Sequence, residues 1–318
     1  MTIQQFRSNG ISQLQETSPS PQLDIDVLLE YCLKLSKTQL LLKRQELLSP
    51  QQQEWLEEAV QKRKTGLPIA YITGHKEFYG YDFIVSPKVL IPKPDTEILV
   101  ERAIETIIEK MDARPNALLT ICDMCTGSGC IGLAVLRTLI DEYKIPASKL
   151  PEFTLVDISF DALEIARKNA KELLKDFPEE AQLEKQVRFV QSNLFEQIPY
   201  TFDIILTNPP YIPHTMVEDL LKDGRSEPRL ALDGDISIFG DRAYDINGDE
   251  LDDGLEIIRN LIPQAKTHLS PLGKVLMETG EYNAREAAFI AEAAGFKSKI
   301  IPDLEGQLRV VELDKTRG

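Results

Sequence analysis

The sequence predicts an α/β protein with a largely parallel sheet, preceded by a small helical domain. From about residue 117 onward, short β-branched runs alternate with longer amphipathic segments, which is typical of a parallel sheet covered by helices on both faces. Residues 1–75 instead carry apolar residues at helical spacing. We expect a helical domain over 1–75, a hairpin and linker helix over 76–116, and the α/β domain over 117–318.

The first 75 residues contain two helical signals. One is an apolar stripe at helical spacing. The other is Ser49-Pro50-Gln51-Gln52, which predicts a helix start with Ser49 as N-cap, Pro50 in the first turn and Gln52 completing a capping box. Because this segment holds no polar constellation, we interpret it as a docking or capping module. The stripe consists of Leu23, Val27, Leu28, Tyr31, Cys32 and Leu35.

The linking segment changes its pattern twice. Residues 71–85 are aromatic and β-branched around two glycines, which predicts a hairpin. Residues 90–97 form a proline-stiffened linker, and Asp95 or Thr96 is the expected N-cap of a helix that continues to Ile107.

The α/β domain is expected to contain a seven-stranded sheet. Its last two strands follow each other without a long helix between them, so one of them is expected to run antiparallel. The predicted helices span about 131–142, 160–175, 252–268 and 283–294. The predicted strands are 118–123, 153–157, 187–191, 202–207, 274–279, 297–301 and 308–313.

Charge and cysteine content narrow the possible functions. The net charge is −15, which disfavours nucleic acid, because phosphate binding needs clustered Lys and Arg. No apolar run approaches the ~20 residues needed to span a bilayer, and the first residues lack a signal pattern. The four cysteines suit reduced thiols in the cytoplasm. With only three histidines and no second ligand pair beside Cys122 and Cys125, we expect no metal site.

The most informative stretch is Thr207-Asn208-Pro209-Pro210-Tyr211, which follows the buried strand 202–206. Two prolines forbid a helix and stiffen the chain as it leaves the strand. They hold Asn208 and Tyr211 at a carboxyl end of the sheet, where open α/β sheets bind ligands. An Asn amide can bond in plane to a flat amino group, and an aromatic ring can stack on that group. Asn208, Pro209, Pro210 and Tyr211 are therefore the predicted catalytic residues.

A second ligand site is predicted at the end of strand 118–123. Asp123 is followed by Cys125-Thr126-Gly127-Ser128-Gly129 and an apolar helix. A glycine-rich turn of this kind lets a ligand approach the backbone and helix N–H groups. Strand 153–157 ends in Asp157, whose carboxylate can accept both hydroxyls of a ribose.

The loop departs from two common nucleotide motifs. It lacks the third glycine of a dinucleotide fingerprint, since Leu133 stands there, and no Gly-Lys-Ser/Thr follows as in a phosphate-binding P-loop. A strand-end acid, a short glycine turn and a ribose acid instead look like the S-adenosylmethionine site of class I methyltransferases, which have a Rossmann-like mixed sheet.

With these residues placed, the chain resembles the HemK/PrmC family, the N5-glutamine methyltransferases of peptide chain release factors. That resemblance implies methylation of the glutamine in the GGQ motif of class I release factors, with S-adenosyl-L-homocysteine as product. The matching segments are Pro68-Ile69-Ala70-Tyr71-Ile72-Thr73-Gly74, Glu77-Phe78-Tyr79-Gly80, Leu90-Ile91-Pro92-Lys93-Pro94-Asp95-Thr96-Glu97, Thr126-Gly127-Ser128-Gly129, Asn208-Pro209-Pro210-Tyr211-Ile212 and Glu227-Pro228-Arg229-Leu230-Ala231-Leu232.

The resemblance also implies roles for the site residues. Asn208 to Tyr211 would hold the substrate glutamine, with Asn208 also close to the cofactor. We expect the Asn208 oxygen and the Pro209 carbonyl to accept the two N–H groups, while Tyr211 packs on the amide plane. The expected cofactor contacts are Asp123 before the loop, Cys125, Thr126, Gly127, Ser128 and Gly129 around the methionine end, Asp157 on the ribose, and Asn193 with Leu194 beside the adenine.

Four features depart from the family pattern. Lys93 stands where an Arg is usual, so the paired hydrogen bonds that a guanidinium group can donate are lost. Cys125 takes a place often held by glycine, and Asn193 replaces a common Asp, although its amide oxygen can still accept from an adenine amino group. Residues 235–250 look inserted, and we interpret them as a surface hairpin or loop.

Three alternatives stay open. Amino-methyltransferases of nucleic acids use a similar Asn-Pro-Pro-Tyr turn, but they extract a base and usually carry a basic recognition region. The glutamine methyltransferase of a large-subunit ribosomal protein shares the Cys-Thr-Gly-Ser-Gly-Cys loop at Cys125–Cys130, whereas Pro94-Asp95-Thr96-Glu97 favours the release-factor branch. The third alternative is a cofactor-binding scaffold without activity. We expect a monomer that binds no nucleic acid directly and no membrane.

Overall fold

The computed structural model describes residues 1–175, 177, 185–222, 226–236, 241, 243–244 and 248–315. Two compact units make up the chain. The first comprises Met1–His75 with Asp219–Ser226, and the second comprises Lys76–Glu218 with Glu227–Gly318. No helix among the described residues is both long enough and apolar enough to cross a bilayer.

The helices of residues 1–75 pack around a core of their own. At the start of α4, the Ser49 hydroxyl accepts from Gln52 N–H and the Gln52 side chain accepts from Ser49 N–H, which confirms the predicted capping box. Leu14, Ile25 and Leu56 are among the fully buried side chains. The helices are α1 (Ile3–Leu14), α2 (Pro21–Leu33), α3 (Lys37–Leu42), α4 (Pro50–Lys64) and α5 (Ile69–Thr73).

The predicted stripe on α2 is wrong at its first position. Leu23 is 60% exposed, because the neighbouring Asp24 turns inward on the same helical turn. Asp24 accepts from Ser18 Oγ at 2.6 Å and pairs with Arg63 Nε at 2.6 Å. Leu28 is buried as expected. A buried ion pair therefore overrides the apolar pattern in this turn.

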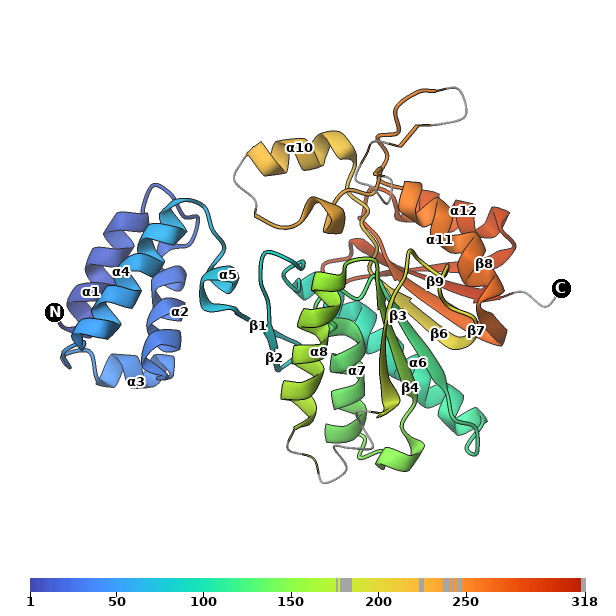
Figure 1. Cartoon of the computed structure of the whole chain (residues 1–318), viewed down its shortest axis with the longest axis horizontal. Helices are drawn as coiled ribbons and strands as arrows, with labels where there is room; N and C mark the ends of the chain where they lie inside the picture. Colours follow the sequence, from blue (N-terminus) through green and yellow to red (C-terminus); the bar gives the residue numbers. More distant parts are fainter. Residues whose placement is uncertain are drawn as a thin grey trace. The chain divides into compact units, whose positions relative to one another are not determined.

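The second unit contains the expected seven-stranded mixed sheet, and its strand order is β5-β4-β3-β6-β7-β9-β8 (Figure 1). All described neighbours pair in parallel except β9, which runs antiparallel to both β7 and β8. The strands are β3 (Thr120–Met124), β4 (Glu152–Asp157), β5 (Val187–Gln191), β6 (Phe202–Thr207), β7 (Leu269–Glu278), β8 (Phe296–Pro302) and β9 (Leu308–Lys315).

Side-chain alternation along the strands builds a core on each face of the sheet. Ile121 and Ile204 join one apolar cluster, whereas Cys122 and Ile205, one residue along each strand, join the other. Figure 1 shows α6 (Glu97–Ala113), α7 (Cys130–Asp141) and α8 (Phe160–Leu174) on one face, and α11 (Glu256–Thr267) with α12 (Ala284–Ala293) on the other. Both faces are covered, as the alternation of strands and helices predicts.

The segment before the sheet domain forms a hairpin, β1 (His75–Phe78) and β2 (Tyr81–Ile84), followed by the short 3-10 helix η1 (Pro94–Thr96). The hairpin was predicted to begin at residue 71, which is wrong, because residues 71–73 belong to α5. Thr96 occupies the N-cap position of α6, but its side chain makes no capping hydrogen bond. The predicted N-cap position is therefore confirmed, but the expected capping hydrogen bond is absent from this residue, because the Thr96 hydroxyl accepts from Asn208 instead. A short helix, α10 (His214–Lys222), and the 3-10 helices η2 (Ala147–Lys149) and η3 (Arg229–Ala231) were not predicted.

The expected insertion, residues 235–250, lies partly outside the described residues. Within the described part, Tyr244 and Glu250 form an antiparallel bridge, which fits a hairpin. The start of the segment is not on the surface: Asp235 is fully buried and accepts from the backbone N–H of Gly254 at 2.7 Å. Asp235 is thus a structural residue that ties this segment to the chain before α11.

Two glycines let backbone segments meet beneath the Asn-Pro-Pro-Tyr turn. A β-carbon on Gly254 would overlap the carbonyl oxygen of Tyr211, and one on Gly234 would overlap the carbonyl of Gly254. Gly254 also has a positive φ of 71°. The position after Tyr211 is therefore held by direct backbone packing that leaves no space for a side chain.

We expect Gly254→Ala to destabilise the protein far more than Gly248→Ala. Both glycines have positive φ, so each alanine costs about 1–2 kcal/mol in backbone strain. A β-carbon at Gly248 meets nothing within 4 Å, whereas at Gly254 it collides with Tyr211 and adds about 1–3 kcal/mol. Chemical denaturation of both variants measures the difference, and equal losses would contradict the packing argument.

Candidate active site

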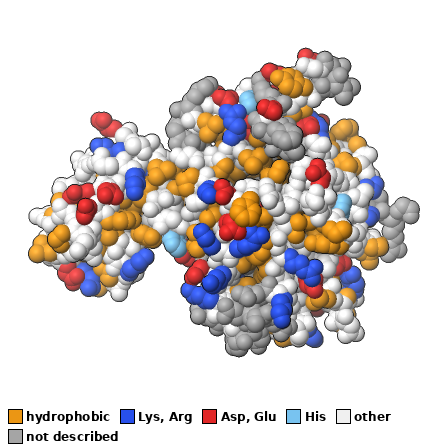
Figure 2. All heavy atoms as spheres, viewed as in Figure 1, with side chains coloured by type: hydrophobic (Ala, Val, Ile, Leu, Met, Phe, Trp, Pro, Cys, Tyr) orange, Lys and Arg blue, Asp and Glu red, His pale blue; other side chains and the backbone are white. Residues whose placement is uncertain are grey.

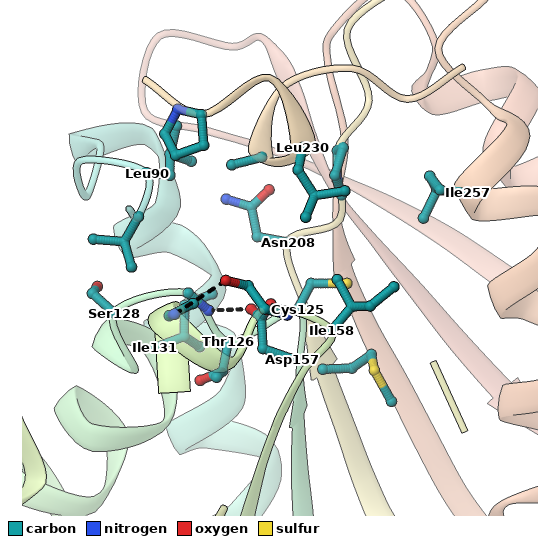
Figure 3. Close-up of a pocket in the computed structure, with 18 of the residues that line it drawn as sticks. Leu90, Cys125, Thr126, Ser128, Ile131, Asp157, Ile158, Asn208, Leu230 and Ile257 are labelled. Carbon is teal, nitrogen blue, oxygen red and sulfur yellow. Dashed lines mark hydrogen bonds between the residues drawn. The ribbon is translucent and has the colours of Figure 1, made fainter. Parts of the chain in front are cut away.

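A deep pocket lies where the carboxyl ends of β3, β4 and β6 meet (Figure 3). It encloses about 1160 Å³, the space at its open mouth included. The glycine loop and Asp157 line it together with Asn208, so the two predicted ligand sites share one cavity. Predicted site residues that line it are Cys125, Thr126, Gly127, Ser128, Asp157, Asn193, Leu194, Asn208 and Pro210.

The loop after β3 is built from left-handed backbone. Gly127 and Gly129 have φ of 56° and 80°, and Cys125 adopts 59° although it carries a side chain. A β-carbon at Gly129 would come within 3.0–3.3 Å of Leu133, Leu155 and Ala166, so this glycine allows the loop to pack on the sheet and helix. Gly129 itself is not among the pocket-lining residues; it shapes the loop from behind.

Asp157 holds the loop from the end of β4. Its Oδ2 accepts from Gly127 N–H at 2.8 Å, and its Oδ1 accepts from Ser159 N–H at 2.9 Å. Burial raises the pKa of Asp157, and these backbone donors oppose that rise. A carboxylate oxygen accepts more than one hydrogen bond, so Asp157 retains acceptor capacity toward the pocket.

Asp123 lies beneath the loop and is not among the described lining residues. It is fully buried, and its Oδ2 accepts from Thr126 Oγ1 at 2.6 Å and from Gly132 N–H at 3.0 Å. Burial raises its pKa to about 6 despite these donors. The geometry makes Asp123 a brace between the loop and the first turn of α7.

The far end of the pocket is lined by Asn193 and Leu194. Asn193 Nδ2 donates to Glu196 Oε1 at 2.6 Å, which leaves the Asn193 carbonyl oxygen as an acceptor. Leu194 is buried and has a φ of 46°, so the chain turns sharply after β5. An apolar wall next to an amide acceptor suits an aromatic base that carries an amino group.

The Asn-Pro-Pro-Tyr turn is divided between pocket and interior. Asn208 and Pro210 line the pocket, whereas Pro209 and Tyr211 are not among the lining residues. Tyr211 O–H donates to Glu278 Oε1 at 3.2 Å, and the Tyr211 carbonyl accepts from Asn283 Nδ2 at 2.9 Å. Tyr211 is therefore anchored toward β7 and α12, and stacking of its ring on a substrate stays a prediction.

The residue that replaces the usual arginine has a defined partner. Lys93 Nζ pairs with Glu227 Oε1 at 2.6 Å, and the same oxygen accepts from Ile91 N–H at 3.4 Å. Lys93 lines the pocket, as do Pro228 and Leu230 of the Glu-Pro-Arg-Leu segment. The sequence analysis identified both segments. It could not predict the ion pair between them, because the two residues are 134 positions apart and no local pattern links them.

The sequence argument missed two polar residues next to Asn208. Asn208 Nδ2 donates to Thr96 Oγ1 at 3.3 Å, and Glu278 lies buried at the end of β7. Thr96 was expected only as a helix cap, and Glu278 follows an apolar strand with no motif around it. A rule that inspects every residue at a carboxyl strand end would have found Glu278.

The cysteines are all free thiols, and Cys125 lines the pocket. Burial raises the pKa of Cys130 to about 12 and that of Cys122 well above its usual value, so both are protonated near neutral pH. Among the described residues, no group of three or more His, Cys, Asp or Glu side chains is arranged to hold a metal ion.

Asp123→Asn should change how stability depends on pH. The folded-state pKa lies above the ordinary value of 3.8, so the contribution of Asp123 is fully present below that value and is lost as pH rises through about 6. We expect the wild type to lose about 2 kcal/mol relative to Asp123→Asn between pH 4 and 7. Denaturation of both proteins across this range measures the difference; a constant difference would contradict the buried, raised pKa.

Two family models match the chain: the PrmC N-terminal domain over residues 5–74 and the methyltransferase small domain over residues 99–246. A release factor glutamine methyltransferase from Koribacter versatilis is 36% identical, with 98% of each chain covered. A second, from Moorella thermoacetica, is 33% identical, with 97% of each covered. A solved release factor-specific protein-(glutamine-N5) methyltransferase from Alicyclobacillus acidocaldarius is 21% identical, with 74% of this chain and 100% of that chain covered at a TM-score of 0.37. The chain therefore belongs to the release factor glutamine methyltransferase family.

Proposed function

We propose that this protein uses S-adenosylmethionine to methylate the side-chain amide nitrogen of the glutamine in the GGQ motif of class I peptide chain release factors. The observation that carries the proposal is the shared pocket: Asn208 lies in the same cavity as the glycine loop and Asp157. An acceptor for an amide N–H thus lies next to a nucleoside-type site. The names of the relatives supply the protein substrate.

The pocket residues fit the cofactor. Gly127 has open space where a β-carbon would be, so a ligand can approach the loop backbone. Asp157 would accept from the ribose hydroxyls, and Asn193 and Leu194 would flank the adenine. Cys125, Thr126, Ser128 and the loop glycines would surround the methionine end, with Asp123 holding the loop from below. When bound, the sulfonium cofactor supplies an activated methyl group.

The chain's own task is to position a weak nucleophile. An amide nitrogen is a poor nucleophile because its lone pair is delocalised into the carbonyl. The Asn208 oxygen and the Pro209 carbonyl would accept the two N–H groups and aim the nitrogen in line with the methyl group. The same acceptors stabilise the positive charge that develops on nitrogen. The nitrogen would take up the methyl group that the cofactor supplies and would give up one proton, so that the methylated amide is neutral.

Charge supports a protein rather than a nucleic-acid substrate. Figure 2 shows Lys and Arg side chains interspersed with Asp and Glu across the face in view, and the chain carries a net charge of −15. Such a surface lacks the strong positive field that attracts phosphates. The helical segment 1–75 would serve as a docking module for the release factor. The free cysteines support a cytoplasmic location, and we propose a monomer.

The proposed substrate is tested by transfer of labelled methyl from S-adenosylmethionine to a purified class I release factor. A release factor whose GGQ glutamine is changed to alanine is the control. We expect label on the wild-type factor only. Label on neither factor, together with label on a large-subunit ribosomal protein, would assign that protein as the substrate instead. The Cys125–Cys130 loop is the reason to test it.

Asn208→Ala should lower kcat by about 10²-fold or more, because it removes an acceptor that acts on the reacting nitrogen. The affinity for S-adenosylhomocysteine should change little. Asn193→Ala is the matched control, since it should weaken cofactor binding and leave kcat near the wild-type value. Steady-state kinetics and calorimetric binding separate the two effects, and an Asn208→Ala variant with wild-type turnover would refute the assignment.

A further inference from the structure

An ion pair joins two segments that line the pocket and lie far apart in the sequence. Lys93 Nζ lies 2.6 Å from Glu227 Oε1, and the backbone N–H of Ile91 donates to the same oxygen at 3.4 Å. The Glu227 side chain is only 4% exposed, whereas that of Lys93 is 38% exposed. A carboxylate buried to this degree is costly unless N–H donors compensate it, so Glu227 is held firmly against the segment that carries Lys93.

The two segments form facing walls of the pocket. Lining residues within 88–96 make up the first wall, and lining residues within 228–236 make up the second wall. Figure 3 shows Leu90 of the first wall and Leu230 of the second wall on opposite sides of Asn208. The ion pair therefore connects the two walls directly.

Each wall is also attached to the turn that carries Asn208. Thr96 of the first wall shares a hydrogen bond with the Asn208 side chain at 3.3 Å. The second wall pairs with the chain just after the turn: Ile212 N–H donates to the Leu232 carbonyl at 3.0 Å, and Gly234 N–H donates to the Ile212 carbonyl at 2.9 Å. Both walls are thus anchored at one end, independently of the ion pair.

These contacts close into a ring. From Lys93 the ring follows the chain to Thr96 and crosses by a hydrogen bond to Asn208. It follows the Asn-Pro-Pro-Tyr turn, crosses by backbone hydrogen bonds to Leu232, and follows the chain back to Glu227. The ion pair completes it. Because Lys93, Thr96 and Asn208 all line the pocket, the ring borders the cavity at its Asn208 end.

We propose that Lys93 and Glu227 are positioning residues that close this ring and so fix the space in which the substrate glutamine meets Asn208. The inference rests on the proposed function, because that function assigns Asn208 to the substrate amide. In the same proposal the cofactor is held elsewhere in the pocket, by the glycine loop after β3 and by Asp157. The ion pair therefore acts on the protein substrate and leaves the affinity for the cofactor unchanged.

The residue type at position 93 determines how firmly the ring is closed. A lysine ammonium is a point charge on a flexible chain, whereas a guanidinium group can donate two parallel hydrogen bonds to one carboxylate. The partly exposed Lys93 closes the ring through a single contact, for which water can compete. An arginine at this position keeps the charge and makes the closure stronger.

The test compares Lys93→Met, Lys93→Arg and Glu227→Gln in the full chain, with a class I release factor as methyl acceptor. Asp161→Asn is the matched control, because it breaks the Lys88–Asp161 pair. That pair also has a separation of 2.6 Å, but it joins the first wall to α8 and is no part of the ring. For each protein we measure kcat, KM, the affinity for S-adenosylhomocysteine, the thermal midpoint and amide hydrogen exchange over residues 228–234.

We expect Lys93→Met to lower kcat/KM for the release factor at least 10-fold, with S-adenosylhomocysteine affinity within twofold of wild type. Glu227→Gln should lose less, since a neutral amide oxygen still accepts from lysine. Hydrogen exchange over 228–234 should become at least fivefold faster in Lys93→Met, because the second wall loses its attachment to the first. Lys93→Arg should keep at least the wild-type kcat/KM and exchange more slowly, and Asp161→Asn should match the wild type.

A wild-type kcat/KM in Lys93→Met, or unchanged hydrogen exchange over 228–234, would overturn the inference. A comparable loss of S-adenosylhomocysteine affinity would assign the ion pair to the integrity of the whole pocket and overturn its role toward the substrate. If Lys93→Met does not fold, the other two variants decide: a loss in Lys93→Arg as large as that in Glu227→Gln would contradict the proposal, since arginine retains the charge.

Failure of the proposed function is distinguishable from failure of this inference. If the wild type does not label the release factor, the proposed substrate fails on its own. Hydrogen exchange needs no substrate, so faster exchange in Lys93→Met still supports the ring and unchanged exchange still refutes it. The kinetic comparison is then made on the protein that the wild type does label.

Discussion

The candidate active site depends on the parallel pairing of β3 with β6. In that register, Asp123 lies opposite Leu206 and Met124 opposite Thr207, so the two strands end at the same level. The glycine loop and the Asn-Pro-Pro-Tyr turn leave the sheet from these adjacent ends. Because side chains alternate with a period of two, a slip of one residue would exchange the two apolar faces as well as separate the loops. The burial of both faces therefore secures the alignment of donor and acceptor sites.

Three carboxyl groups lie in or near the site, of which Asp123 and Glu278 are buried and Asp157 is partly buried, and each makes a different structural contact. Asp123 holds the loop to α7, Asp157 holds the loop to β4, and Glu278 supports the turn that carries Asn208. Their common cost is desolvation, which raises the pKa of each. A family of methyltransferases that must orient a neutral amide needs rigid acceptors more than it needs a strong base. The desolvation of these carboxyl groups lowers the free energy of unfolding, and the gain is a rigid site.

Much of the fold could be predicted from local patterns. Strands β5 and β6 were predicted with the observed bounds, because short β-branched runs between turn residues have few alternative structures. The glycine loop and the Asn-Pro-Pro-Tyr turn were recognised because backbone conformation restricts which residues can occupy them. The predictions of burial were wrong where a contact with a residue distant in the sequence determines it. Leu23 is exposed because Asp24 pairs with Arg63, and Asp235 is buried because it binds Gly254. Thr96 was expected to cap a helix, yet it serves Asn208, 112 positions away. Such pairings depend on tertiary contacts, which residue periodicity does not encode.

Cys125 places a thiol in the wall of the pocket, so its protonation state matters for the proposed reaction. The residue lines the cavity in which we propose that a methyl group is transferred to a weakly nucleophilic amide. A thiolate at that place would be the better nucleophile and would compete for the electrophilic carbon. Burial, reinforced by the negative charge of Asp157, raises the pKa of Cys125 and keeps the sulfur protonated. In the proposed reaction, a protonated thiol at this place would not compete with the substrate amide for the methyl group.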